Sequence, residues 1–151
     1  MRILLAAAGA ALLAGTASAQ EIKVNPGQWE TSSTLNLSLT MDGATQQMPP
    51  ETETSSECWA TEADTVLSAD MLALDGCNIK NVTGDTYKLA FDMDCNMEGI
   101  PMTGNATITV APDRNSTEGY INLSANAQGI AINANGKLTG KLTGKRVGTC
   151  S

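Results

Sequence analysis

The sequence predicts an all-β fold, an antiparallel barrel or sandwich of about eight strands with one short helix. Apolar and polar residues alternate with a period of two along most of the chain, which is typical of strands with one buried face. Turn-forming pairs that contain glycine, asparagine or aspartate separate these stretches. Residues 20–151 are enough for one hydrophobic core and too few for two domains of ordinary size, so a single β domain is expected.

The first 19 residues have the pattern of a secretory signal peptide. Arg2 supplies a positive charge, residues 3–13 an apolar segment, and Ala17-Ser18-Ala19 a small-residue cleavage site, so cleavage is expected after Ala19. The apolar segment is too short for a secure membrane span, and no cysteine lies at the cleavage point to carry a lipid. The single arginine and the core of alanine and leucine are typical of bacterial signals, so we expect a periplasmic protein.

The first strand is expected over residues 29–41, with the odd-numbered side chains on its inner face, and Asp42-Gly43 ends it. Residues 44–55 contain two consecutive prolines, which disfavour a central strand. We expect a loop there, leading into an exposed strand that reaches Cys58.

One short helix is expected over residues 62–69. Thr61 and Asp64 have the spacing of a capping box, which satisfies backbone amides at a helix start. Four apolar residues after this start give the helix an apolar side: Val66, Leu67, Met71 and Leu72.

Strands are expected to resume after the helix. The clearest one places Tyr87, Leu89, Phe91, Met93 and Cys95 on one face. Asn135-Gly136 is a strong signal for a hairpin turn. The other expected elements are a strand at 79–82, a turn at 84–85, a turn at 96–101, strands at 102–110 and 121–127, a turn at 128–129, a strand at 130–134 and a last strand from Leu138 toward Cys150.

The chain contains four cysteines, and an even number in an exported protein favours disulfides over free thiols. Three connectivities are possible. We favour Cys77–Cys95, because a hairpin at residues 83–86 brings the two close together, and this leaves Cys58–Cys150. The chain-entropy model assigns about 3 kcal/mol to the shorter loop and about 4.6 kcal/mol to the longer one.

Composition excludes several classes of function. Nine basic residues against 16 acidic ones give a net charge of −7, so the chain is unsuited to nucleic acid or to anionic lipid. The absence of histidine excludes Ser-His-Asp and Cys-His catalysis and histidine-bound metals. No S-x-x-K or G-x-S-x-G signature is present. We therefore expect a protein that is not an enzyme and needs no cofactor.

No metal site is expected either. No two cysteines form a C-x-x-C pair. Asp92, Asp94, Asn96 and Glu98 share one face, but Met97 and Thr103 stand where a Ca²⁺-binding loop needs glycine and glutamate, so this is expected to be a solvated acidic face. Methionines near Cys95 suggest copper only weakly, since Met93 alternates inward with the core.

Gly27-Gln28-Trp29 opens the first strand, and Lys145-Arg146 lies near the end of the last one. In lipocalin-like barrels a G-x-W triplet opens the first strand and a late cation packs over the indole. Gly27, Trp29 and Arg146 are therefore candidates for closing one end of a barrel, through a cation–π contact of about 0.5 to 2 kcal/mol. The alternative is that Trp29 is only a core residue.

A wider set of motifs occurs in order along the chain: Pro26-Gly27-Gln28-Trp29-Glu30, the cysteines at 58, 77 and 95, Gly84-Asp85-Thr86, Met102-Thr103-Gly104, and Gly144-Lys145-Arg146-Val147-Gly148-Thr149-Cys150. The chain thereby resembles the exported bacterial family called domain of unknown function 3617, over nearly all of residues 20–151. It is poorer in methionine and glycine over residues 36–50 than such a family suggests. The resemblance implies a periplasmic location and paired cysteines, and it implies no activity.

Many inward positions carry alanine, glycine, serine or threonine, which is expected either for close contact between sheets or for an internal hollow. The leading hypothesis is a monomeric binding module for a small apolar or amphipathic ligand, lined by Trp29, Tyr87 and Phe91. An alternative is an envelope interaction or structural protein that docks through an exposed strand or the acidic segment 51–57. A carboxylate-dependent hydrolase is the third and weakest hypothesis.

Overall fold

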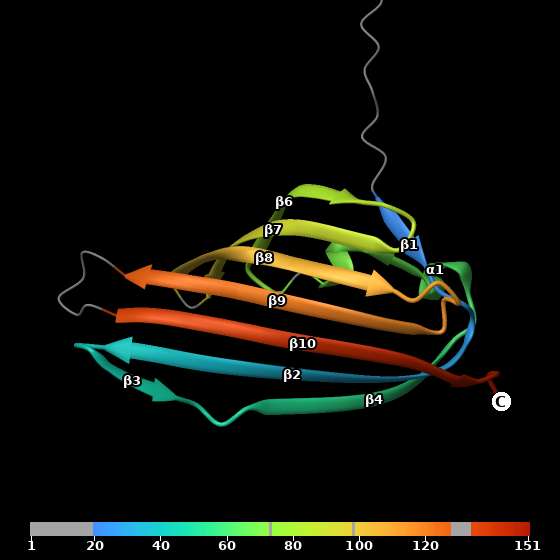
Figure 1. The fold of residues 1–151 in the computed structure, drawn as a ribbon, viewed down its shortest axis with the longest axis horizontal. Coiled ribbons are helices and arrows are strands. Elements are labelled where there is room, and N and C mark those ends of the chain that lie inside the picture. The colour runs from blue at the N-terminus through green and yellow to red at the C-terminus, as the bar shows by residue number, and fades with distance from the viewer. Residues whose placement is uncertain (1–19, 73, 98, 128–133) are drawn as a thin grey trace, which may run out of the picture.

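Eight strands form one antiparallel sheet in the computed structural model, which describes residues 20–72, 74–97, 99–127 and 134–151 (Figure 1). The order is β3-β2-β10-β9-β8-β7-β6, and β4 pairs with β2 on the same side as β3. The all-β class and the number of strands are thus confirmed. The strands of this sheet are β2 (Gly27–Met41), β3 (Ala44–Gln47), β4 (Glu51–Trp59), β6 (Cys77–Gly84), β7 (Lys88–Met97), β8 (Ile100–Val110), β9 (Ser116–Ala127) and β10 (Ala134–Gly148).

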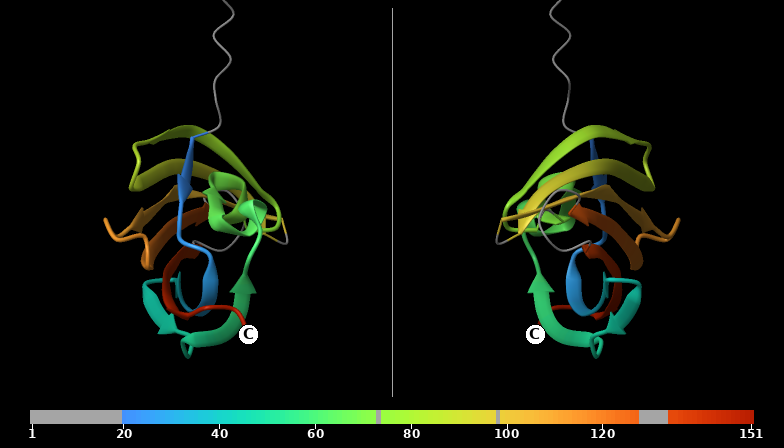
Figure 2. Two further views of the ribbon diagram at one scale, coloured as in Figure 1. Left: turned by 90° about the vertical axis from the view of Figure 1, so that its right-hand side faces the viewer. Right: turned by 90° about the vertical axis from the view of Figure 1, so that its left-hand side faces the viewer.

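The sheet is curled, and a two-stranded sheet of β1 (Glu21–Lys23) and β5 (Val66–Ser68) lies within its concave side, with α1 (Glu62–Thr65) and the 3₁₀-helix η1 (Ala69–Leu72) (Figure 2). Trp29, Phe91 and Leu123 are buried, so we assign them to this covered, concave face. Within the described ranges, β6 pairs only with β7, and β3 and β4 pair only with β2. The large sheet therefore stays open, and the sandwich alternative describes it better than a closed barrel.

Alternation along the strands builds the core. In β7, Leu89, Phe91, Met93 and Cys95 are buried between exposed or half-buried neighbours, as the sequence predicts. Most of the equivalent concave positions of β8 and β9 are buried as well, and Gly104 and Ile121 are half-buried. The other buried apolar residues are Ile22, Val24, Trp29, Leu67, Ala69, Met102, Ala106, Ile108, Val110, Leu123, Ala125 and Leu138.

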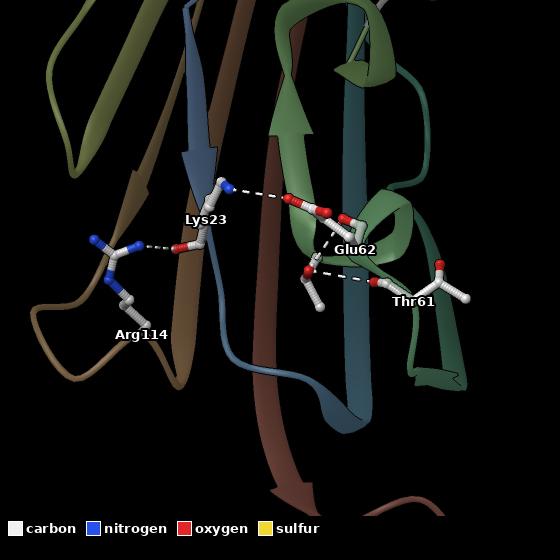
Figure 3. Close-up of polar contacts among 5 residues, drawn as sticks. Lys23, Thr61, Glu62 and Arg114 are labelled. Carbon is white, nitrogen blue, oxygen red and sulfur yellow. Dashed lines mark hydrogen bonds and ion pairs between the residues drawn. The ribbon is translucent and has the colours of Figure 1, made fainter.

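Polar contacts tie the small sheet to its surroundings (Figure 3). Lys23 Nζ lies 3.3 Å from Glu62 Oε1, which joins β1 to α1. Arg114 Nη1 donates a hydrogen bond of 3.1 Å to the Lys23 carbonyl oxygen, which joins β1 to the turn between β8 and β9. The two contacts hold β1 between elements that are far apart in the sequence.

The capping box at Thr61 and Asp64 is present, but the helix that it starts is shorter than expected. Thr61 Oγ1 accepts from the Asp64 amide and the Asp64 carboxylate accepts from the Thr61 amide, so hydrogen bonds from Thr61 lower the pKa of Asp64. The helix ends at Thr65 because residues 66–68 pair with β1, which buries Leu67 against Ile22. The predicted helix over 62–69 is therefore wrong in its second half.

Two turn predictions need correction. Asn135-Gly136 lies inside β10, paired with Asn126 and Ala125 on one side and with Thr40 and Leu39 on the other. Asp42-Gly43, expected only to end a strand, is a hairpin turn with positive φ at both residues, and residues 44–47 pair back as β3 rather than forming a loop. The expected turn at 128–129, the strand residues 130–133 and the signal peptide lie outside the described residues.

No helix among the described residues is long and apolar enough to cross a membrane.

Candidate ligand-binding site

Two disulfides fix the ends of the sheet. Cys77 and Cys95 face each other in register on β6 and β7, and Cys58 of β4 is bonded to Cys150, which follows β10. Both expected pairings are confirmed. Disulfides of this kind indicate an oxidising compartment.

Trp29, Tyr87 and Phe91 do not surround a common hollow. The Trp29 indole is fully buried, stacks on Trp59 with 4.8 Å between ring centroids, and donates a 2.9 Å hydrogen bond from Nε1 to the Asn25 carbonyl oxygen. Phe91 is 2% exposed and belongs to the same core.

Tyr87 was expected to face inward and instead is 42% exposed, with the Arg114 guanidinium 5.7 Å from its ring centroid. The reason is the turn before β7. The Asp85 carboxylate accepts hydrogen bonds from the Tyr87 and Lys88 amides, so Tyr87 belongs to the turn and not to the alternating strand.

Gly27, Trp29 and Arg146 do meet where β2 begins and β10 ends, but not through the expected cation–π contact. Arg146 Nε donates a 2.7 Å hydrogen bond to the Pro26 carbonyl oxygen, and its side chain lies against Gly27. Trp59 is the ring that stacks on the Trp29 indole. The arginine therefore anchors the chain that enters β2 instead of covering the tryptophan.

Gly27→Ala is expected to lower the free energy of unfolding by about 2 kcal/mol or more. Gly27 has φ +152°, and a Cβ there would collide with the Gly148 carbonyl oxygen and with Arg146 Nε. Urea unfolding measures the effect. Gly148→Ala is the matched control at the same end of the sheet, because a Cβ at Gly148 meets nothing within 4 Å. Equal stability of the two variants would contradict this account of Gly27.

An apolar pocket of about 220 Å³ lies between η1 and the concave face. Leu142 of β10 pairs with Ser33 on one side and Gly119 on the other, and in the next row Gly140 pairs with Ile121. The two glycines leave room because a Cβ at Gly119 would lie 3.3 Å from the Leu142 Cβ, and one at Gly140 would lie 2.8 Å from a Leu35 methyl carbon. The pocket is lined by Ser33, Met71, Leu74, Thr107, Gly119, Tyr120, Ile121, Gly140, Lys141 and Leu142.

Sequence reasoning predicted small inward residues and a possible hollow, but it did not locate this pocket. Leu142 and Ile121 were identified only as strand residues, and Met71 was assigned to the apolar side of a helix. Met71 instead lies in η1 and is 56% exposed at the pocket. Alternation gives the face of each strand, whereas the contribution of η1 depends on tertiary packing.

A larger and more polar hollow of about 720 Å³ is lined by β4, β2 and β10. Hydroxyl groups that line this hollow already have hydrogen-bond partners. Thr31 Oγ1 lies 2.9 Å from Ser55 Oγ, and Ser56 Oγ accepts a 3.0 Å hydrogen bond from Nε2 of Gln28, which lies next to the hollow. Its remaining lining residues are Glu30, Ser32, Thr54, Thr143, Gly144 and Lys145. The hydroxyls already engaged in these pairs make it a weaker candidate than the apolar pocket.

The acidic face of β7 is engaged in contacts within the sheet. Asp94 pairs with Lys80, Asp92 accepts a 2.8 Å hydrogen bond from Asn81, and Asn96 accepts one of 2.9 Å from the Gly99 amide. Glu98 lies outside the described residues. In the part of the chain that the structure describes, no group of three or more acidic or cysteine side chains is placed to hold a metal ion.

Comparison with protein families gives a match over almost the whole described chain. The sequence model of the family "Protein of unknown function (DUF3617)" matches residues 24–150. The chain belongs to the DUF3617 family. In this DUF3617 member the matched region contains Gly27, Trp29, Arg146 and all four cysteines, so the anchored end of the sheet and both disulfides lie inside it. No curated protein and no solved structure matches the chain.

Proposed function

We propose that this protein is exported to the bacterial periplasm, loses residues 1–19, and binds a small apolar or amphipathic molecule in the pocket between η1 and the concave face. The pocket itself carries the proposal: Leu142, Ile121 and Leu74 present apolar surface around two glycines. Apolar surface removed from water contributes about 25 cal/mol per Å². The disulfides support export, since they persist in an oxidising compartment.

The size of the pocket indicates how a ligand would lie. About 220 Å³ is below the roughly 300–1,000 Å³ of sites for drug-sized molecules. It therefore holds one short apolar part of a ligand, and the rest extends along the half-buried leucines 35, 37 and 39 of β2. Exposed Met71 can adapt to different shapes because its side chain is unbranched and flexible.

The proposal is for binding without catalysis. Lys141 is among the lining residues, but its Nζ lies 3.8 Å from Glu118 Oε1 and 5.7 Å from the Tyr120 ring centroid, which places the amine on the convex side. Ser33 is the one lining residue from β2, and its side chain is on the concave face. The Ser33 hydroxyl and the Lys141 amine are therefore on opposite faces of the sheet.

The test uses the neutral dye N-phenyl-1-naphthylamine and protein purified from an exporting host. Ser33→Trp places an indole in the pocket and is expected to weaken dye binding by about tenfold or more, which corresponds to a loss of about 1.4 kcal/mol or more of binding free energy. Ser124→Trp is the matched control, since Ser124 is exposed on β9 and its side chain lies on the convex face. Fluorescence titration measures both affinities.

Native mass spectrometry of the same material is expected to show a chain beginning at Gln20 with a small molecule bound. The absence of dye binding in the unaltered protein, or equal binding by both tryptophan variants, would refute the pocket as the site. A measured mass showing that the purified chain still carries residues 1–19 would refute processing by a signal peptidase.

A further inference from the structure

Strand β4 presents a long free edge. Its nine residues pair with β2 in continuous register, from Gly27↔Trp59 to Leu35↔Glu51, without a shift. Residues 51–58 are exposed, and among the described residues no strand pairs with the other edge of β4. A strand at the edge of a sheet presents unpaired N–H and C=O groups that can pair with another chain.

The other edges carry the usual protections against such pairing. Strand β6 has a register shift between Lys80 and Thr83, with Asn81 at φ 52°, and a bulge of this kind interrupts a regular ladder. Strand β3 has only four residues. Strand β4 has neither device, because it is long and regular and the prolines at 49 and 50 precede it.

The side chains of β4 determine which chain can pair there. Glu51, Glu53 and Glu57 share one face, since they lie opposite Leu35, Ser33 and Trp29 of β2. None of the ion pairs among the described residues involves these three carboxylates. A second copy of β4 would bring like charges face to face, which is unfavourable, whereas lysine or arginine at alternate positions would lie opposite the carboxylates.

The edge is also held in place before any partner arrives. The Cys58–Cys150 disulfide fixes one end of β4, and side-chain hydrogen bonds to β2, such as Thr34–Thr52 at 3.1 Å, follow its length. A partner strand therefore has only itself to order, which reduces the entropic cost of association.

We propose that the free edge of β4 binds an extended, lysine- or arginine-rich segment of a partner protein by β-strand addition. Backbone hydrogen bonds supply the pairing, and Glu51, Glu53 and Glu57 select a basic segment. This interaction uses the backbone edge of β4 and not the space beneath η1, although Glu53 and Glu51 lie beside Ser33 and Leu35 on the same face of the sheet.

The test uses a capped nine-residue peptide in which lysine alternates with valine or threonine. Binding to the oxidised protein is measured by fluorescence anisotropy, and hydrogen exchange locates the site. The lysine peptide is expected to bind and to slow amide exchange in β4 but not in β6. A peptide with glutamate in place of lysine, and a lysine peptide with every second backbone nitrogen methylated, are each expected to bind about tenfold more weakly or not at all.

Variants of the protein separate local charge from net charge. The triple variant Glu51→Gln, Glu53→Gln, Glu57→Gln is expected to weaken the lysine peptide about tenfold, the combined effect of three cross-strand charge pairs. The charge-matched control Glu21→Gln, Asp70→Gln, Glu118→Gln carries its changes on β1, η1 and β9, none of which pairs with β4, and is expected to stay within about twofold. Equal binding of the methylated peptide, equal effects of the two triple variants, or a homodimer with protected β4 amides would overturn the proposal.

Discussion

Removing the Cys58–Cys150 disulfide, by Cys58→Ala together with Cys150→Ala, is expected to lower the free energy of unfolding by up to about 4.6 kcal/mol. The two cysteines are 92 residues apart, so their bond removes much of the freedom of the unfolded chain. In the folded protein the bond holds β4, whose only strand partner among the described residues is β2. Urea unfolding followed by far-ultraviolet circular dichroism measures the loss.

The comparison for this prediction is Cys77→Ala with Cys95→Ala, which opens a loop of 18 residues and is expected to cost about 3 kcal/mol. Both variants leave two cysteines able to pair, so the comparison concerns loop length. A larger loss from the shorter loop would show that strain or residual structure, and not chain entropy, dominates in this protein.

Trp29→Ala is expected to cost about 3 to 5 kcal/mol, the range for removing a large buried aromatic side chain. Trp29 is fully buried, and the variant would leave a void beside Trp59 and an unpaired Asn25 carbonyl oxygen. Thermal and urea unfolding monitored by circular dichroism measure the loss. Because the chain has two tryptophans, the emission of the remaining Trp59 is also expected to shift to longer wavelength.

Tyr120→Ala is the control, since Tyr120 is 47% exposed on the convex face and its removal is expected to change stability by no more than about 0.5 kcal/mol. If Trp29→Ala cost as little as Tyr120→Ala, Trp29 would not be the central residue at that end of the core.

Alternation in the sequence predicted most strands because each strand of an antiparallel sheet with one buried face must place its apolar residues at every second position. Leu89, Phe91 and Met93 show this directly. The prediction failed at Asn135-Gly136, where the local preference for a turn is overridden by ladders on both sides of β10. It also failed at residues 66–68, where pairing with β1 overrides the helix that Thr61 begins.

The candidate site was less predictable than the fold. The sequence predicts Gly140 and Leu142 in the last strand and leaves Gly119 outside the strand expected at 121–127, and only the register of β9 and β10 brings them into adjacent rows. Met71 reaches the pocket from the 3₁₀-helix η1, and Leu74 follows that helix in the chain, so no periodic pattern places the two residues together. The disulfides could be predicted because the hairpin before β7 limits the possible partners of Cys77.

The long disulfide also sets the order in which the protein can mature. Cys58 leaves the ribosome well ahead of its partner Cys150, and both Cys77 and Cys95 are synthesised in between. Short loops close more readily than long ones, so oxidation before Cys150 has been synthesised would join Cys58 to the wrong thiol. Recovery from such a bond would require thiol–disulfide exchange, so we expect the yield of correctly oxidised protein to rise with the disulfide isomerase activity of the host.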